Sequence, residues 1–328
     1  MRFLKRPPID VEPEQIFEEC LAGYTGRSKE EKAANEEKRQ KLLTCQDLIK
    51  ADSTDYNNRI LSGSFVPSSL PEGISKTYLS QVYSDTFSKE DKPGRIYYDI
   101  IRGQAPCARC PICGSKGGNT HLDHYLPKSE FPTLSVTPDN LIPICSACNE
   151  KKGTYHSLDR KTRPFHLYFD RLKSGNGADD KNNPVVFLKA VIAKDYKIIF
   201  QVDHPSDRDA ELRSRIDKHL EIYGLLKRYE ACVEPEIAQL WCDWQDKITD
   251  TLEDIPKSIH TQQVEAELLH DLVLEGIRRW RRTPNTWESA LYRAMDTQKD
   301  MLYDWFKDNA NEIKKAVQKY CAVDPDDE

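Results

Sequence analysis

The chain has 328 residues, of which 38% are hydrophobic and 31% charged, and its 15 tyrosines, 10 phenylalanines and 5 tryptophans exclude a disordered protein because they can fill a core. No apolar run approaches the ~20 residues that span a bilayer, and the first residues lack the apolar stretch of a signal peptide, so we expect a cytoplasmic protein with no membrane segment. The formal net charge of −6 argues against a generic basic nucleic-acid binder.

Residues 1–105 are expected to form an N-terminal helical region. One of its helices starts at Ser28, and Glu31 three residues later completes a capping box. The turn-rich stretch 51–73 predicts a loop or short elements. The apolar spacing predicts helices over 13–24, 28–51, 74–87 and 93–104.

Residues 106–173 differ from the rest of the chain in composition. The stretch 101–173 holds eleven Lys or Arg and six Asp or Glu, so the acidic excess lies elsewhere. A basic module on an acidic body is typical of a protein that meets a polyanion at one site, although an uneven solvated surface gives the same pattern.

Residues 174–328 predict a hairpin followed by helices. Two β-rich arms in 185–203 flank a polar break at Lys194-Asp195. The helical period then returns, with a capping box of Asn285 and Glu288 for the last helix. The expected helices cover 206–224, 225–252, 257–282 and 286–320. Because this helical region is longer than a small site needs, we expect it to bind a partner protein, a second copy of the chain or a nucleic-acid duplex.

Ten cysteines in a chain without an export signal suggest metal binding rather than disulfides. Two pairs have the two-residue spacing of knuckles that hold structural Zn²⁺ in a tetrahedron. Cys107 precedes the first pair at the same spacing and stays an alternative, while Pro111 and Gly114 supply turn chemistry for the later pairing. The predicted ligands are Cys110, Cys113, Cys145 and Cys148.

Harder ligand types lie around these knuckles. Asp123 and His124 follow the first pair, Asn140 precedes the second pair, and Asn149 directly follows it. Oxygen donors suit Mg²⁺ or Mn²⁺, and a histidine beside them is suited to act as a general base.

These segments, CPICG at 110–114, LDHYLP at 122–127 and DNLIPICSACNEKKG at 139–153, together resemble the HNH nuclease motif of the ββα-metal class. PGRIYYDII, HLYFD and NTWESALYRA are more loosely similar to bacterial HNH proteins, some of which belong to anti-phage systems. The resemblance implies a mostly helical α+β fold. In it, a zinc-stapled ββα module at 106–173 lies between the N-terminal helical region and a C-terminal hairpin-plus-helices region at 174–328.

The resemblance also implies roles for single residues. His124 would be the general base that activates water, and Asp123 and Asn149 would hold a catalytic Mg²⁺ or Mn²⁺. Asn140 would fix the loop that carries the base. Many family members have histidine at the position of Asn149, so His156 is an alternative ligand, or else a surface histidine.

Basic residues near the motif are expected to contact DNA phosphates. For Lys151 and Lys152 an equal alternative is that they offset the negative charge of a Zn(Cys)₄ site. The segment 278–282, RRWRR, either grips nucleic acid or ends a helix with cations that favour its dipole. The predicted phosphate contacts are Lys128, Lys151, Lys152, Arg160, Lys161 and Arg163.

The sequence thus predicts a metal-dependent HNH endonuclease that hydrolyses phosphodiester bonds of DNA. A monomer would nick one strand, and a dimer would make double-strand breaks. A role as the nuclease of a bacterial anti-phage system is expected from the family alone. The alternatives are a non-catalytic zinc-stapled module that binds nucleic acid or protein, and an HNH-type RNase.

Overall fold

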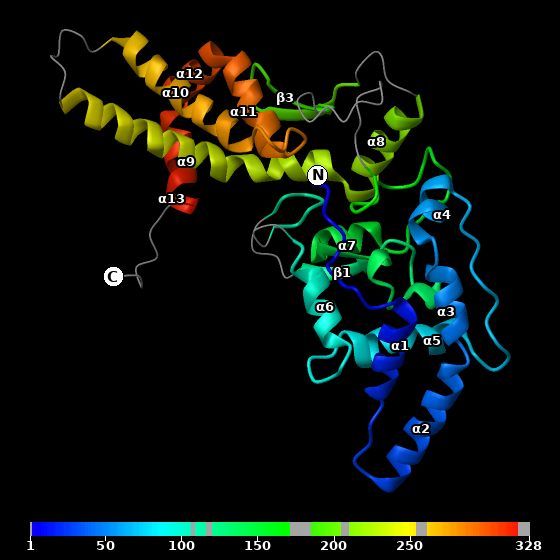
Figure 1. Ribbon diagram of the computed structural model, residues 1–328. Helices are drawn as coiled ribbons and strands as arrows, with labels where there is room; N and C mark the ends of the chain where they lie inside the picture. Colours follow the sequence, from blue (N-terminus) through cyan, green and yellow to red (C-terminus); the bar gives the residue numbers. More distant parts are fainter. Residues whose placement is uncertain are drawn as a thin grey trace. The chain divides into compact units, whose positions relative to one another are not determined.

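The computed structural model describes residues 2–105, 109–115, 120–170, 185–204, 210–253 and 261–320. The chain divides into two compact units, which Figure 1 colours along the sequence. The N-terminal unit contains Arg2–Arg171 and Asp209–Tyr223, and the C-terminal unit contains Leu172–Arg208 and Gly224–Glu328. The fold is α+β and mostly helical, as predicted. None of the described helices combines the length and the apolarity needed to cross a lipid bilayer.

Short helices build most of the N-terminal unit. The capping box is confirmed: the Ser28 hydroxyl accepts from the backbone N–H of Glu31, whose carboxylate accepts from the N–H of Ser28. The turn-rich stretch contains a helix, and the expected helix over 74–87 ends in a π-helical turn, Tyr83–Phe87. The helices are α1 (Pro13–Ala22), α2 (Lys29–Leu43), α3 (Gln46–Ser53), α4 (Tyr56–Ser62), α5 (Lys76–Val82) and α6 (Arg95–Arg102).

The motif segment folds as a hairpin and a helix within the same unit. Strand β1 (Thr120–His124) pairs antiparallel with β2 (Leu141–Cys145), and α7 (Ser146–Lys152) follows. Two 3₁₀ turns, Pro132–Leu134 and Pro138–Asn140, lie in the loop between the strands, and α8 (Ala210–Tyr223) packs against α7.

The hairpin shares its core with the N-terminal helices. Leu122 and Leu141 of the strands are buried in one cluster with Phe17, Val82 and Ile101 of the helices. All five residues of β2 are buried. The helices therefore cover the hairpin, and the division of the chain at residues 105 and 173 stays a prediction.

The C-terminal unit holds the predicted second hairpin. Strand β3 (Leu188–Ile192) pairs antiparallel with β4 (Ile198–Val202), with Ala190 opposite Phe200. Burial alternates along both strands, so one face packs against helices and the other faces solvent. The helices are α9 (Leu225–Glu253), α10 (Gln262–Trp280), α11 (Trp287–Thr297), α12 (Lys299–Asp308) and α13 (Ala310–Tyr320).

The single helix predicted over 286–320 is wrong, because it is three helices. Gln298 breaks it first: its amide donates to the carbonyl of Ile192 (2.8 Å) and accepts from the N–H of Ile192 (2.9 Å). Asn309 makes the second break. The predicted Asn285 capping box is also wrong, because Thr286 is the N-cap and its hydroxyl accepts from Ser289 N–H.

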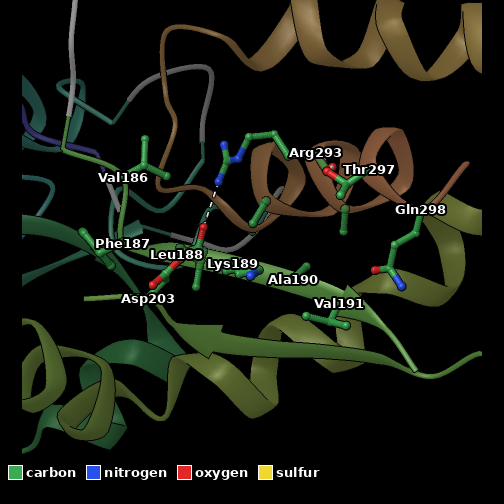
Figure 2. A pocket seen from close by; sticks show the side chains of 12 residues that line it. Val186, Phe187, Leu188, Lys189, Ala190, Val191, Asp203, Arg293, Thr297 and Gln298 are labelled. Atoms are coloured by element: carbon green, nitrogen blue, oxygen red, sulfur yellow. Dashed lines mark hydrogen bonds between the residues drawn. The ribbon is translucent and has the colours of Figure 1, made fainter. Parts of the chain in front are cut away.

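Asn285 instead holds the free edge of β3. Its amide oxygen accepts from the N–H groups of Phe187 (2.8 Å) and Leu188 (3.2 Å), and its NH₂ donates to the carbonyl of Val185 (2.6 Å). A cavity of about 480 Å³ opens further along this edge, between β3 and α11 (Figure 2), and Arg293 donates across it to the Leu188 carbonyl. Arg293 of α11, with Asn285 and Gln298 on either side of that helix, therefore takes the place of a third strand.

Candidate functional site

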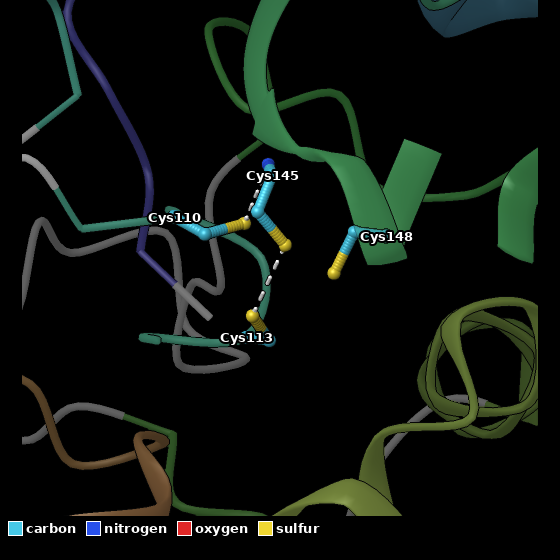
Figure 3. Close-up of side chains that lie close together, drawn as sticks. All are labelled: Cys110, Cys113, Cys145 and Cys148. Atoms are coloured by element: carbon cyan, nitrogen blue, oxygen red, sulfur yellow. Dashed lines mark hydrogen bonds between the residues drawn. The ribbon is translucent and has the colours of Figure 1, made fainter. Parts of the chain in front are cut away.

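Four cysteine sulfurs gather beside the β1–β2 hairpin (Figure 3). Their Sγ atoms all lie within 4.8 Å of one another, and all four side chains are buried. The Sγ atoms of Cys113 and Cys145 are 3.7 Å apart. A tetrahedral zinc ion with Zn–S bonds of about 2.3 Å places its sulfurs about 3.8 Å apart, so the cluster has the size of a structural zinc site. Its members are Cys110, Cys113, Cys145 and Cys148.

The backbone around the sulfurs is arranged as tight turns. The N–H of Gly114, at φ +82°, donates to the carbonyl of Cys110 (2.8 Å), and the N–H of Cys145 donates to Cys110 Sγ (3.4 Å). Hydrogen bonds among the four sulfurs lower the pKa of Cys113 to about 6 and lower that of Cys145, while they raise the pKa of Cys110 and of Cys148. Four buried sulfurs at this spacing form a donor set that fits Zn²⁺. The alternative ligand Cys107 lies outside the described residues.

His124 ends strand β1, and its ring is buried with one defined hydrogen bond. Its Nε2 lies 2.9 Å from the carbonyl oxygen of Ser135. Because a carbonyl only accepts, Nε2 carries the proton and Nδ1 keeps its lone pair. Burial lowers the pKa of His124 to about 3, so the ring is neutral at pH 7. A neutral imidazole with a fixed tautomer is the form that a general base requires.

Asp123 precedes His124 on β1, and its carboxylate is held by an ammonium group. Lys152 Nζ lies 3.0 Å from Oδ2 and 3.1 Å from Oδ1 of Asp123, and it also donates to the His124 carbonyl (2.8 Å). Burial raises the pKa of Asp123 to about 6, against the opposing effect of the Lys152 charge. The carboxylate is therefore ionised at pH 7 and fixed by α7.

Asn140 ties together the loop that follows His124. Its amide oxygen accepts from the N–H of Leu126 (2.8 Å) and from the hydroxyl of Tyr56 (2.8 Å). Its NH₂ donates to the carbonyls of Leu126 (3.0 Å) and Leu134 (3.2 Å). The side chain is fully buried, so its hydrogen bonds fix the path of the loop.

Asn149 lies on α7, partly exposed, and its side chain makes no hydrogen bond to another described residue. Asn149 and Lys152 are three residues apart on one helix and so share a face. Since Lys152 reaches Asp123, we expect Asn149 to lie on the side of α7 that faces β1. A carboxylate and an amide oxygen fit Mg²⁺ or Mn²⁺. His156 instead packs its ring against Phe131, with centroids 5.1 Å apart.

Two of the six predicted phosphate contacts do not reach the surface. Lys152 is held inside by Asp123, and Arg163 forms a buried bidentate pair with Asp170, at 2.8 and 3.0 Å. A Lys or Arg side chain in a buried ion pair is not available to bind phosphate. The predicted phosphate contacts at Lys152 and Arg163 are therefore wrong. The remaining candidates are Lys128, Lys151, Arg160 and Lys161, of which Arg160 pairs with Glu211 at 3.1 Å and Lys128 is half-buried.

The sequence did not predict that Tyr83 packs against the ring of His124. Tyr83, in the π-helical turn, packs edge-on against the His124 ring with centroids 4.5 Å apart, and its hydroxyl donates to the Leu122 carbonyl (3.4 Å). π-Helical turns are frequent at functional sites, but the sequence gives no signal that separates one from an α-helix. The sequence identified Lys152 as a basic residue near the motif, but it did not predict the ion pair with Asp123.

Comparison with known proteins agrees with this geometry. Residues 110–154 match the family model described as HNH endonuclease, so this segment is an HNH endonuclease domain, as the motif predicted. Protein ea31 of Escherichia phage lambda is 25% identical over 241 residues, which are 72% of this chain and 77% of ea31. Septu protein PtuB of Bacillus thuringiensis is 50% identical over 68 residues, 20% of this chain and 26% of PtuB. No solved structure matches the chain significantly.

Proposed function

We propose that the chain is a metal-dependent endonuclease that hydrolyses phosphodiester bonds of DNA. The observation that carries the proposal is the state of His124, whose Nε2–H is bound to the Ser135 carbonyl while Nδ1 keeps a lone pair. This histidine lies next to a buried carboxylate, in a domain whose family is described as HNH endonuclease.

In the proposed reaction His124 Nδ1 takes a proton from the attacking water. The positive charge that the ring gains is stabilised by the carbonyl of Ser135, which already accepts from Nε2. Tyr83 and the loop fixed by Asn140 keep the imidazole from rotating, so its lone pair stays aimed at one place.

Asp123 and Asn149 would hold the catalytic cation. When bound, Mg²⁺ or Mn²⁺ supplies positive charge beside the leaving 3′-oxygen and the phosphoryl group. Lys152 keeps Asp123 oriented, and its ammonium opposes the effect of burial on the carboxylate pKa. The four sulfurs would hold a structural Zn²⁺ that fixes the start of α7, which carries both Asn149 and Lys152.

The proposed DNA substrate rests on the remaining basic residues, and the proposed biological role rests on similarity to a known protein. Lys128, Lys151, Arg160 and Lys161 would contact the phosphate backbone. One site cuts one strand, so a monomer nicks DNA and a dimer makes double-strand breaks. The similarity to Septu protein PtuB supports a place in a bacterial anti-phage system. We further propose that the protein acts in the cytoplasm and that its C-terminal helices bind a partner protein or a second copy.

The test compares wild type with His124→Ala on supercoiled plasmid, with Mg²⁺, with Mn²⁺ and with no added divalent cation. We expect wild type to cut only with a divalent cation, and the variant to lose about 10²- to 10⁴-fold in rate, the usual contribution of a general base. His156→Ala is the matched control, because it removes a partly exposed histidine near the same site.

The amount of zinc bound per protein, measured by inductively coupled plasma mass spectrometry, should be the same in His124→Ala as in wild type if the variant keeps its fold. Full cutting by that variant would show that the assigned base is wrong. A wild-type protein that binds DNA but cuts neither DNA nor RNA would favour the non-catalytic module. Cleavage of structured RNA with DNA spared would favour the RNase.

A further inference from the structure

Four arginines stand together where α10 of the C-terminal unit ends. Arg278 and Arg279 lie in the last turn of the helix, Arg281 caps it, and Arg282 follows. We name these four residues the arginine corner. All four are exposed, and within residues 2–105, 109–115, 120–170, 185–204, 210–253 and 261–320 none of their guanidinium groups forms an ion pair.

The absence of partners is notable in a chain with 54 acidic and 48 basic residues. The segment 276–287 contains four arginines and no Asp or Glu. A helix C-terminus carries about half a negative charge, so one cation is enough to complement it. The positive charge of the corner therefore exceeds what the helix can use.

The backbone that presents the arginines is held in place. The N–H of Thr283 donates to the Trp280 carbonyl (3.0 Å), and the N–H of Thr286 donates to the Thr283 carbonyl (3.1 Å). Arg293 donates to the carbonyl of Pro284 (3.0 Å), and the buried amide of Asn285 is anchored on β3. The guanidinium stems thus start from a rigid support, which lowers the entropic cost of binding.

Guanidinium groups without carboxylate partners are suited to phosphate oxygens, which they bind in a bidentate manner. We propose that the arginine corner is a second nucleic-acid contact, which grips the phosphate backbone of DNA independently of sequence. It would add its affinity to that of the HNH domain, where four of the six predicted phosphate contacts remain. The inference rests on the proposed function only for its choice of DNA as the polymer.

The experiment measures binding of a fluorescently labelled DNA duplex by anisotropy, without added divalent cation, between about 50 and about 200 mM salt. The test variants are Arg278→Ser with Arg279→Ser, and Arg281→Ser with Arg282→Ser. Each lost phosphate contact lowers the slope of log K against log salt by about 0.9, so each double variant should lose about 1.8. Affinity at low salt should fall about tenfold or more.

The matched control is Arg27→Ser with Lys29→Ser, which removes two exposed charges from the other unit and should leave the slope unchanged. Hydrolysis of bis(p-nitrophenyl) phosphate, a phosphodiester too small to reach a second contact, separates the two proposals. The arginine variants should keep it, and His124→Ala should lose it. Unchanged slopes in the double variants, or a wild-type protein that does not bind the duplex, would overturn the arginine corner, whereas loss of hydrolysis alone concerns the catalytic proposal.

Discussion

The two hairpins of this protein are similar in size and differ in what stabilises them. Both β1–β2 and β3–β4 are antiparallel pairs of five-residue strands, and an isolated pair of this size is marginal in water. Every residue of β2 is buried, and the strand ends at Cys145 of the cysteine cluster. Residues of β3 and β4 instead alternate between buried and exposed. The first hairpin is held by the cysteine cluster and covering helices, and the second by side chains of α11 and of the residues that flank it. Only the first carries groups suited to catalysis.

The largest expected effect comes from Cys145→Ser, which removes one zinc ligand. Structural zinc contributes about 10 to 16 kcal/mol of apparent binding free energy in small zinc domains, so the N-terminal unit should lose its cooperative unfolding. All five tryptophans lie in the C-terminal unit, so their fluorescence should stay native-like. Hydrogen exchange read by mass spectrometry would follow both units. Cys232→Ser is the control. If Cys145→Ser binds no zinc and β1 keeps its native protection from hydrogen exchange, the cysteine cluster does not stabilise the first hairpin.

A smaller effect is expected from Asn285→Ala, which acts on the second hairpin. The change removes three hydrogen bonds to the backbone of residues 185–188, and unsatisfied buried groups cost about 1 to 3 kcal/mol each. We expect the C-terminal unit to lose about 3 kcal/mol or more of unfolding free energy, measured by tryptophan fluorescence in denaturant. Asn311→Ala, on the exposed side of α13, is the matched control. If both variants unfold alike, Asn285 does not hold the edge of β3 in the way described.

The smallest effect of a single substitution is expected on the way the stability of the N-terminal unit depends on pH. Burial lowers the pKa of His166 and of His219 to about 3, below the ordinary value of 6.5, so the unfolded chain binds more protons between these values. The stabilisation that these two histidines contribute to the N-terminal unit is therefore full above pH 6.5. It falls as the pH drops toward 3, by about 1.4 kcal/mol per pH unit for each histidine.

His219→Asn isolates one of these contributions. The ring accepts a hydrogen bond from the Phe165 N–H at 3.3 Å, which an asparagine oxygen can also accept. Unfolding followed by hydrogen exchange at pH 6.5 and pH 5 should show a slope smaller by about 1.4 kcal/mol per pH unit. An unaltered slope would mean that His219 does not titrate on unfolding.

The parts of the site that lie close together in sequence could be predicted. The cysteine knuckles, the Asp123–His124 pair and the capping box at Ser28 each depend on residues a few positions apart. The hairpin at 185–203 follows from the same kind of local pattern. The sequence therefore predicted the cysteine cluster and the two hairpins, including the polar break at Lys194-Asp195.

The parts that depend on distant partners could not be predicted. Lys152 and Arg163 resemble surface cations in the sequence, and only the fold brings them to Asp123 and Asp170. The breaks in the last predicted helix depend on β3, because Gln298 bonds to a strand 106 residues earlier. The covering of His124 by Tyr83 likewise depends on packing between separate elements.

The most direct test of the account is anomalous diffraction from crystals of the full chain soaked in Mn²⁺, recorded at the zinc and manganese absorption edges. We expect zinc among the four sulfurs. We expect manganese at the Asp123 carboxylate and Asn149, within reach of Nδ1 of His124 through one water. Zinc at the sulfurs with no manganese near Asp123 would contradict the proposed catalytic site.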